Sequence, residues 1–292
     1  MLIDPTGYTY CHEHLHIDLS AVKQELDCRL DHYEKIADEM RELKQLGVSN
    51  IIEVTNSFMG RNPQFIEDLI KESGVNVLLS TGYYIEGFFP PEVENETAQQ
   101  LANRMIAELE VGLGESQLKA SVIGEVGSSE NTFTPLEQKV FEAAVIAHKE
   151  TGRPISTHQS MSTMGREQVT FFLKHQVNLE RVTIGHCDLK SNLTEILWMI
   201  DQGCYVQFDT IGKNSYFPDE QRIAMLVELS KRGLLERVML SMDITRRSHL
   251  KANGGLGFSY LITDFLPRLR VAGINENEID IMMKQNPYQL FK

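Results

Sequence analysis

The sequence contains no run of about 18 apolar residues and no basic-then-apolar N-terminus, so we expect neither a membrane span nor a signal peptide. The default expectation is a cytoplasmic protein. Its four cysteines lack a repeated short spacing, which favours reduced thiols over a disulfide framework. Basic residues are also fewer than acidic ones, because the sequence has 28 of the former and 41 of the latter, which gives a net charge of -13. This balance argues against a nucleic-acid backbone as a partner.

No Gly/Ser-rich linker and no low-complexity segment interrupts the chain, and 42% of its residues are hydrophobic. We therefore predict one domain over residues 1–292 with a substantial core. Short apolar or β-branched runs, each typical of a buried strand, recur along its whole length. They cover Gly7–Cys11, Asn50–Thr55, Asn76–Thr81, Ala120–Glu125, Pro154–His158, Arg181–His186, Cys204–Asp209 and Arg237–Asp243.

Segments with helical spacing separate most of these runs. One carries apolar residues at Ile36, Met40, Leu43 and Leu46, and it is closed by Gly47, where a left-handed C-cap is wanted. Another opens with the sequence Thr134-Pro135-Leu136-Glu137, which predicts a capping box with proline at the first helical position.

Alternating strands and helices fit two architectures, a doubly wound open sheet and a (β/α)8 TIM barrel. An open sheet binds ligands at one crevice where the strand order reverses, whereas a barrel gathers all strand ends around one axis. Polar residues end the first, fourth, fifth, sixth and eighth predicted strands. They meet only in a barrel, so we predict the (β/α)8 barrel.

Residues of the types that bind metals lie at these strand ends. His12 and His14 are two positions apart, and such residues project to the same face of a strand. His158 and His186 each end a β-prone run, at the face where barrels build active sites. Asp243 ends a hydrophobic strand, where an unpaired charge would be costly to bury. We predict that all of them are metal ligands.

Glu125 completes the predicted metal site. Its functional interpretation is a carboxylate between two cations about 3.5 Å apart, with His12, His14 and Asp243 on one metal and His158 and His186 on the other. Imidazole and carboxylate ligands favour two zinc ions, and manganese, iron or cobalt would also be accepted. The alternative is a salt-bridged or capping glutamate.

The segments His12-Glu13-His14, Thr157-His158, Gly185-His186-Cys187-Asp188 and Ser241-Met242-Asp243 resemble the phosphotriesterase family of the amidohydrolase superfamily, over nearly the whole chain. The resemblance implies a metal-dependent hydrolase with a binuclear centre, whose bridging hydroxide attacks an ester, a lactone or a phosphotriester. Many members carry a carbamylated lysine where this sequence has the shorter Glu125. Metal spacing and substrate preference therefore do not transfer unchanged. Asp243 is the expected proton acceptor.

Two loops are expected to contact the substrate. Tyr84, in Thr81-Gly82-Tyr83-Tyr84, resembles a tyrosine that lies beside the substrate in lactonases, and aromatic packing is the alternative. Arg246 and Arg247 follow Asp243 in a basic loop, and barrels often bind phosphate near the last two strands. Some relatives hydrolyse phosphorylated sugar lactones, so we predict an anionic substrate. The alternative is pairing of both arginines with surface acids.

Other functions stay open at this point. A phosphotriesterase is the second enzymatic interpretation, and a deaminase is less favoured because the additional catalytic Glu and His of that class have no convincing equivalent. A non-catalytic metal-binding or ligand-sensing barrel would lack the proton-handling carboxylate, which Asp243 supplies here. The expected partner is a small molecule, without nucleic acid or membrane, and a homodimer stays open.

Overall fold

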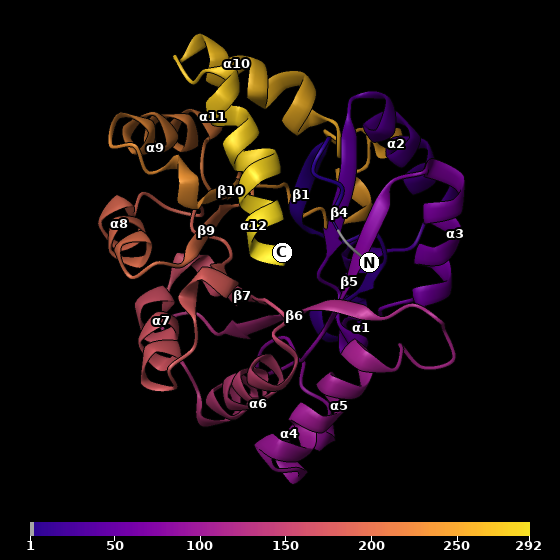
Figure 1. The fold of residues 1–292 in the computed structure, drawn as a ribbon. Helices are drawn as coiled ribbons and strands as arrows, with labels where there is room; N and C mark the ends of the chain where they lie inside the picture. Colours follow the sequence, from indigo (N-terminus) through magenta and orange to yellow (C-terminus); the bar gives the residue numbers. More distant parts are fainter. Residues whose placement is uncertain (1–2) are drawn as a thin grey trace.

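Eight parallel strands form the central sheet of the computed structural model, which describes residues 3–292 (Figure 1). Its order is β1-β4-β5-β6-β7-β8-β9-β10. The strands are β1 (Tyr8–Glu13), β4 (Val48–Glu53), β5 (Asn76–Thr81), β6 (Ala120–Ser128), β7 (Ile155–Gln159), β8 (Val182–Ile184), β9 (Tyr205–Phe208) and β10 (Val238–Leu240). The His12 N–H donates to Ser241 Oγ at 3.1 Å, and the Asp243 N–H donates to the His12 carbonyl at 3.3 Å. The first and last strands therefore meet, which confirms the barrel and excludes the open sheet.

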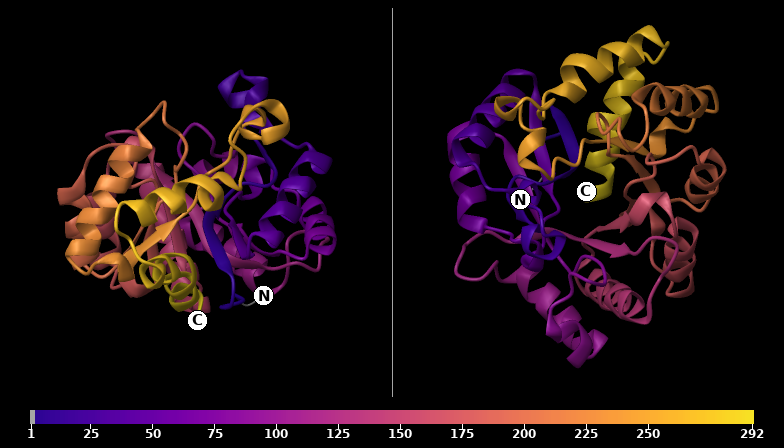
Figure 2. Two further views of the ribbon diagram at one scale, coloured as in Figure 1. Left: turned by 90° about the horizontal axis from the view of Figure 1, so that it is seen from above. Right: turned by 180° about the vertical axis from the view of Figure 1, so that it is seen from behind.

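Helices surround the sheet and form the outer layer of the barrel (Figures 1 and 2). The α-helices are α1 (Ser20–Lys23), α2 (Tyr33–Gln45), α3 (Pro63–Ser73), α4 (Pro91–Asn95), α5 (Ala98–Glu110), α6 (Pro135–Thr151), α7 (Gly165–Lys174), α8 (Leu193–Asp201), α9 (Asp219–Lys231), α10 (Leu266–Val271), α11 (Glu276–Asp280) and α12 (Asn286–Phe291). The 3₁₀ turns are Leu26–Cys28, Ser57–Met59, Ser160–Ser162, Leu179–Arg181, Leu235–Arg237, Arg247–His249 and Lys251–Asn253. Two π-helical segments, Leu261–Phe265 and Ile281–Gln285, lead into α10 and α12.

Local sequence signals set the helix ends as predicted. Thr134 Oγ1 accepts the Glu137 N–H at 3.2 Å, and the Glu137 carboxylate accepts the Thr134 N–H at 2.9 Å, so the capping box of α6 is formed. Pro135 is the first residue of that helix. Gly47 follows α2 with φ +86°, a conformation that costs glycine little.

A small antiparallel pair was not predicted. Strand β2 (Ile17–Asp18) pairs with β3 (Arg29–Leu30), and α1 lies between them in the sequence. Two-residue strands are too short for alternation to show in a sequence. This segment projects beyond the barrel in the left view of Figure 2, where it is indigo, and it stands beside the carboxyl ends of the strands.

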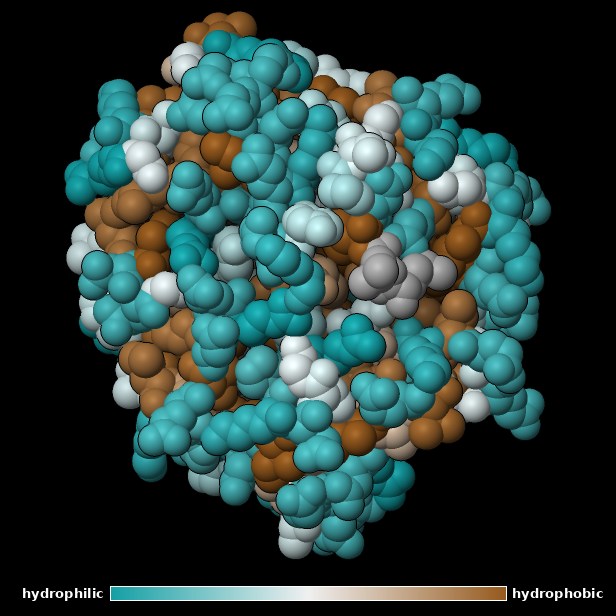
Figure 3. All heavy atoms as spheres, viewed as in Figure 1, coloured by the Kyte–Doolittle hydropathy of each residue, from teal (hydrophilic) through white to brown (hydrophobic). Residues whose placement is uncertain are grey.

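The amino ends of the strands are covered by the C-terminal helix α12. The Asn286 side-chain amide donates to the carbonyls of Leu235 at 2.8 Å and Val238 at 2.6 Å, immediately around the start of β10. Figure 3 shows this face as mostly hydrophilic, with scattered apolar residues. The opposite face holds the carboxyl ends. Within residues 3–292, no helix is long and apolar enough to cross a bilayer.

Candidate metal centre

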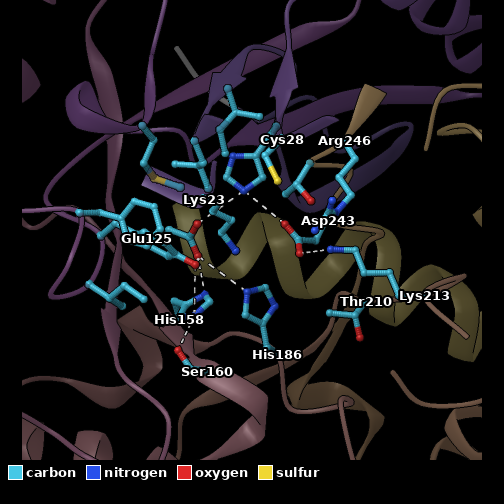
Figure 4. Close-up of a pocket in the computed structure, with 18 of the residues that line it drawn as sticks. Lys23, Cys28, Glu125, His158, Ser160, His186, Thr210, Lys213, Asp243 and Arg246 are labelled. Carbon is cyan, nitrogen blue, oxygen red and sulfur yellow. Dashed lines mark hydrogen bonds and ion pairs between the residues drawn. The ribbon is translucent and has the colours of Figure 1, made fainter. Parts of the chain in front are cut away.

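The predicted metal ligands come together at the carboxyl ends of the strands. His12 lies in β1 and His14 just past it, Glu125 lies in β6 and His158 in β7, and His186 and Asp243 follow β8 and β10. Each of these residues is at most 8% exposed. Figure 4 shows Glu125, His158, His186 and Asp243 pointing toward one another inside the pocket.

Two of these residues have a left-handed backbone, which turns them inward directly after their strands. His186 has φ +54° and Asp243 has φ +52°. This conformation is uncommon for residues other than glycine and must be held by its surroundings. The His186 N–H donates to the Asp209 carboxylate at 2.9 Å. The peptide N–H groups of Met242 and Ile244, on either side of Asp243, donate to the Glu13 carboxylate at 2.7 and 3.0 Å.

Glu125 occupies the middle of the cluster. Its Oε2 lies 3.3 Å from His12 Nε2, 3.2 Å from His158 Nδ1 and 3.8 Å from His186 Nε2. Its Oε1 lies 3.5 Å from His14 Nε2. One carboxylate therefore faces imidazoles from both sides, which is the arrangement expected of a bridging ligand.

Unpartnered buried atoms test whether these residues fit a metal. His12 Nε2, Glu125 Oε2 and His158 Nδ1 are buried and form no hydrogen bond of good geometry within residues 3–292. Buried polar atoms are rarely left without a partner, and a bound ion is one of the explanations for such exceptions. The candidate ligand atoms also fall into three compact groups: His12, His14 and Glu125; Glu125, His158 and His186; His12, His186 and Asp243. The donor set fits two divalent cations that share Glu125.

The electrostatics of the cluster also favour positive charge. Burial alone would lower the pKa of His12, but Asp209 and Glu125 raise it to about 10. Burial alone would raise the pKa of Glu125, but His12 and His158 hold it well below its usual range. Carboxylates thus converge on His12, and the field that they create there is one that would favour a bound cation.

The cavity in front of this cluster has a volume of about 230 Å³ and combines basic and apolar walls. Its basic residues are Lys23, Lys213 and Arg246, and Ile85 and Phe88 are among its apolar ones. Lys213 Nζ contacts Asp243 Oδ2, as Figure 4 shows. Burial alone would raise the pKa of Asp243, but Lys213 and His14 hold it well below its usual range.

The predicted substrate contacts divide into two groups. Tyr84 lines the cavity, with its hydroxyl 3.4 Å from His158 Nε2. Arg246 also lines it, and it pairs at 2.8 Å with Glu25, the residue before the 3₁₀ turn Leu26–Cys28. Arg247 does not line the cavity, because its guanidinium donates to the Arg29 carbonyl at 2.6 Å and to Asp31 at 2.8 Å. Both arginines thus pair with surface acids, as the alternative expects, and of the two only Arg246 also lines the cavity.

Sequence reasoning missed Lys213. The signal was its place in Thr210-Ile211-Gly212-Lys213, directly after the seventh strand of the barrel. Barrels often bind phosphate in the loops after the last two strands, so its position made Lys213 as strong a candidate for a substrate contact as Arg246 and Arg247. It lies beyond the strand end itself, and only the turn of the loop brings it back to the centre.

The barrel and its buried His/Glu/Asp clusters are those of a metal-dependent hydrolase, and comparison with known proteins agrees. Residues 2–291 match the Phosphotriesterase family. The phosphotriesterase homology protein of Escherichia coli K12 is 59% identical over 292 residues, the full length of both chains. Its crystal structure with phosphate in the active site superposes with a TM-score of 0.98 and covers 99% of this chain and 100% of that one.

Two further relatives are more distant. A lactonase from Listeria monocytogenes is 27% identical, with a TM-score of 0.94 over 99% of this chain and 96% of that one. An N-acetyltaurine hydrolase from Dictyostelium discoideum is 30% identical over 274 residues, or 90% of this chain and 74% of that protein. The chain belongs to the phosphotriesterase family, and the predicted resemblance is confirmed.

Proposed function

We propose that the chain is a zinc-dependent hydrolase that opens a lactone or another carboxylic ester carrying an anionic group, with a phosphorylated sugar lactone as the favoured substrate. The observation that carries this proposal is the buried Glu125 carboxylate, which faces imidazoles from both sides next to a cavity lined by Lys213 and Arg246. His12, His14 and Asp243 would hold one ion, and His158 and His186 the other. When bound, two such cations supply a hydroxide from water near neutral pH and polarise the carbonyl.

Asp243 is the residue best placed to handle the proton. Its Oδ1 faces the ligand His14 at 3.2 Å, and its Oδ2 faces the cavity and Lys213. A carboxylate at this position can accept the proton released by the nucleophile and pass it to the leaving oxygen. Lys213, which also lines the cavity, holds the second oxygen by an ion pair.

Several observations support an anionic substrate. Lys23, Lys213 and Arg246 line the cavity of a chain whose net charge is -13, so cationic side chains gather around the site although the chain as a whole is acidic. Guanidinium and ammonium groups bind phosphate through charge-assisted hydrogen bonds. The Escherichia coli relative holds phosphate in its active site, and the Listeria monocytogenes relative is a lactonase.

The experiment is a substrate panel with zinc-loaded protein. It contains neutral lactones, the matching phosphorylated sugar lactones, paraoxon and N-acetyltaurine, whose sulfonate would meet the same cations. We expect the highest kcat/KM for a phosphorylated lactone and little hydrolysis of paraoxon. Failure of a protein with two zinc ions to hydrolyse any ester or amide would favour the ligand-sensing alternative.

Matched arginine variants test the anionic handle. A hydrogen bond to a charged group is worth about 1.5–3 kcal/mol, so Arg246→Met should lower kcat/KM for the phosphorylated lactone roughly 10- to 100-fold and leave the neutral lactone unchanged. Arg247→Met, outside the cavity, is the control and should change neither. Equal losses for both lactones would refute a phosphate contact by Arg246.

The cytoplasmic location and the homodimer stay predictions.

A further inference from the structure

Strand β9 supplies none of the predicted metal ligands, yet one of its side chains and that of the residue directly after it touch two of them. Gln207 and Asp209 are two positions apart and therefore project to the same face of the strand. Gln207 Oε1 lies 3.1 Å from His12 Nδ1. Asp209, directly after β9, is completely buried and reaches two histidines from different strands.

Both oxygens of Asp209 are engaged. Oδ1 lies 2.9 Å from His186 Nδ1, and it accepts the His186 peptide N–H at the same distance. Oδ2 lies 3.2 Å from His12 Nδ1. His12 belongs to the group with His14, and His186 to the group with His158, so one carboxylate contacts a histidine of each group that shares Glu125.

We infer that Asp209 is a positioning residue that holds His12 and His186 together and thereby couples the geometry of the two metal sites. This inference rests on the proposed two-metal function. Asp209 pairs with His186 Nδ1 in a hydrogen bond, and its second oxygen, together with Gln207 Oε1, favours a proton on His12 Nδ1. Each Nε2 is then free to bind a metal. Both Nε2 atoms do point to Glu125 Oε2, at 3.3 and 3.8 Å.

The other histidines show that this arrangement is specific. His14 Nδ1 has its own partner, Thr55 Oγ1, at 2.7 Å. His158 is turned the opposite way, because its Nδ1 faces Glu125 and its Nε2 lies 3.1 Å from Ser160 Oγ. Disturbing Thr55 or Ser160 should therefore affect one side of the centre only, whereas disturbing Asp209 should affect both.

Asp209 also holds the backbone on which His186 depends. His186 has φ +54°, and its peptide N–H donates to the two carboxylate oxygens of Asp209. Asparagine has one acceptor oxygen and a donor amide, so when its oxygen accepts from His186, its amide places a donor beside His12 Nδ1 where the carboxylate placed a negative oxygen. Asp209→Asn thus keeps the size of the side chain and removes the shared contact.

The experiment compares Asp209→Asn with the matched control Thr55→Val. Each protein is loaded with zinc, dialysed against graded concentrations of a chelator and analysed for zinc per chain. Loss of a residue that orients a metal ligand typically weakens metal binding about 10- to 100-fold. We expect Asp209→Asn to weaken both ions by that factor and Thr55→Val to weaken mainly one. Wild-type affinity in Asp209→Asn, or loss of one ion only, would overturn the inference.

Thermal unfolding of the metal-free proteins separates positioning from a general loss of stability. Lower stability of metal-free Asp209→Asn with unchanged zinc affinity would overturn the inference. A wild-type protein that binds no zinc would instead refute the proposed function itself. If Asp209→Asn does not fold, ¹⁵N NMR of the zinc-loaded wild-type histidines decides. We expect protons on Nδ1 of His12 and His186 and on Nε2 of His158, and a proton on Nε2 of His12 or His186 would contradict the inference.

Discussion

Replacement of Glu125 by glutamine keeps the size of the side chain and removes its charge. Glu125 is 2% exposed, and its Oε2 lies within 3.8 Å of nitrogens from three imidazoles. Removing one partner from a buried charge pair costs about 3–5 kcal/mol, and two unit charges 4 Å apart attract by about 4 kcal/mol at an effective dielectric constant of 20. At about 1.4 kcal/mol per tenfold change, Kd for zinc should rise roughly 10²- to 4 × 10³-fold.

The assay is competition for zinc against a chelator of known affinity, with turnover measured on the same sample. We expect metal content and turnover to fall together in Glu125→Gln. Glu108→Gln is the control, because it makes the same chemical change in α5, where Glu108 pairs with Arg61 at 2.7 Å. Unchanged zinc affinity and turnover in Glu125→Gln would refute the bridging role and leave Glu125 as a salt-bridged residue of the strand.

Two further predictions concern Asp243 and His249. Asp243→Asn should keep its fold and at least one metal ion. Its kcat should fall about 10²- to 10⁴-fold, which is the usual contribution of acid-base assistance. A fully metallated variant with undiminished turnover would exclude Asp243 as the proton acceptor. Burial, assisted by Lys213, lowers the pKa of His249 from 6.5 to about 4. As the pH falls, the unfolded chain binds a proton at His249 at a higher pH than the folded chain does. The free energy of unfolding should therefore fall by at most about 3 kcal/mol from pH 6.5 to pH 4. His249→Gln should flatten that slope in urea titrations.

The barrel could be predicted because strand endings and helix caps are local signals. Thr134 and Glu137 form a capping box whatever the rest of the chain does, and eight β-prone runs with helices between them leave few architectures. The meeting of His12, Glu125 and Asp243 followed from the fold, since the carboxyl ends of all barrel strands point to one centre. That inference needed no distances.

The remaining features depend on how loops fold back. Lys213 and Arg247 are both basic residues close after a strand, yet one turns into the cavity and the other turns outward to Asp31. Nothing in their spacing distinguishes them. Glu13 lies between two predicted ligands, and the alternation of a strand directs it to the other face. There it accepts the N–H groups of Met242 and Ile244 across the barrel closure. Such contacts join residues far apart in sequence.

The most direct test of the central claim is a crystal structure of the zinc-loaded protein with anomalous diffraction recorded on both sides of the zinc absorption edge. The proposed centre predicts two anomalous peaks about 3.5 Å apart, with one Glu125 oxygen bound to each ion. His12, His14 and Asp243 should surround one peak, and His158 and His186 the other. A single peak, or two peaks with Glu125 bound to neither, would contradict the bridged binuclear centre.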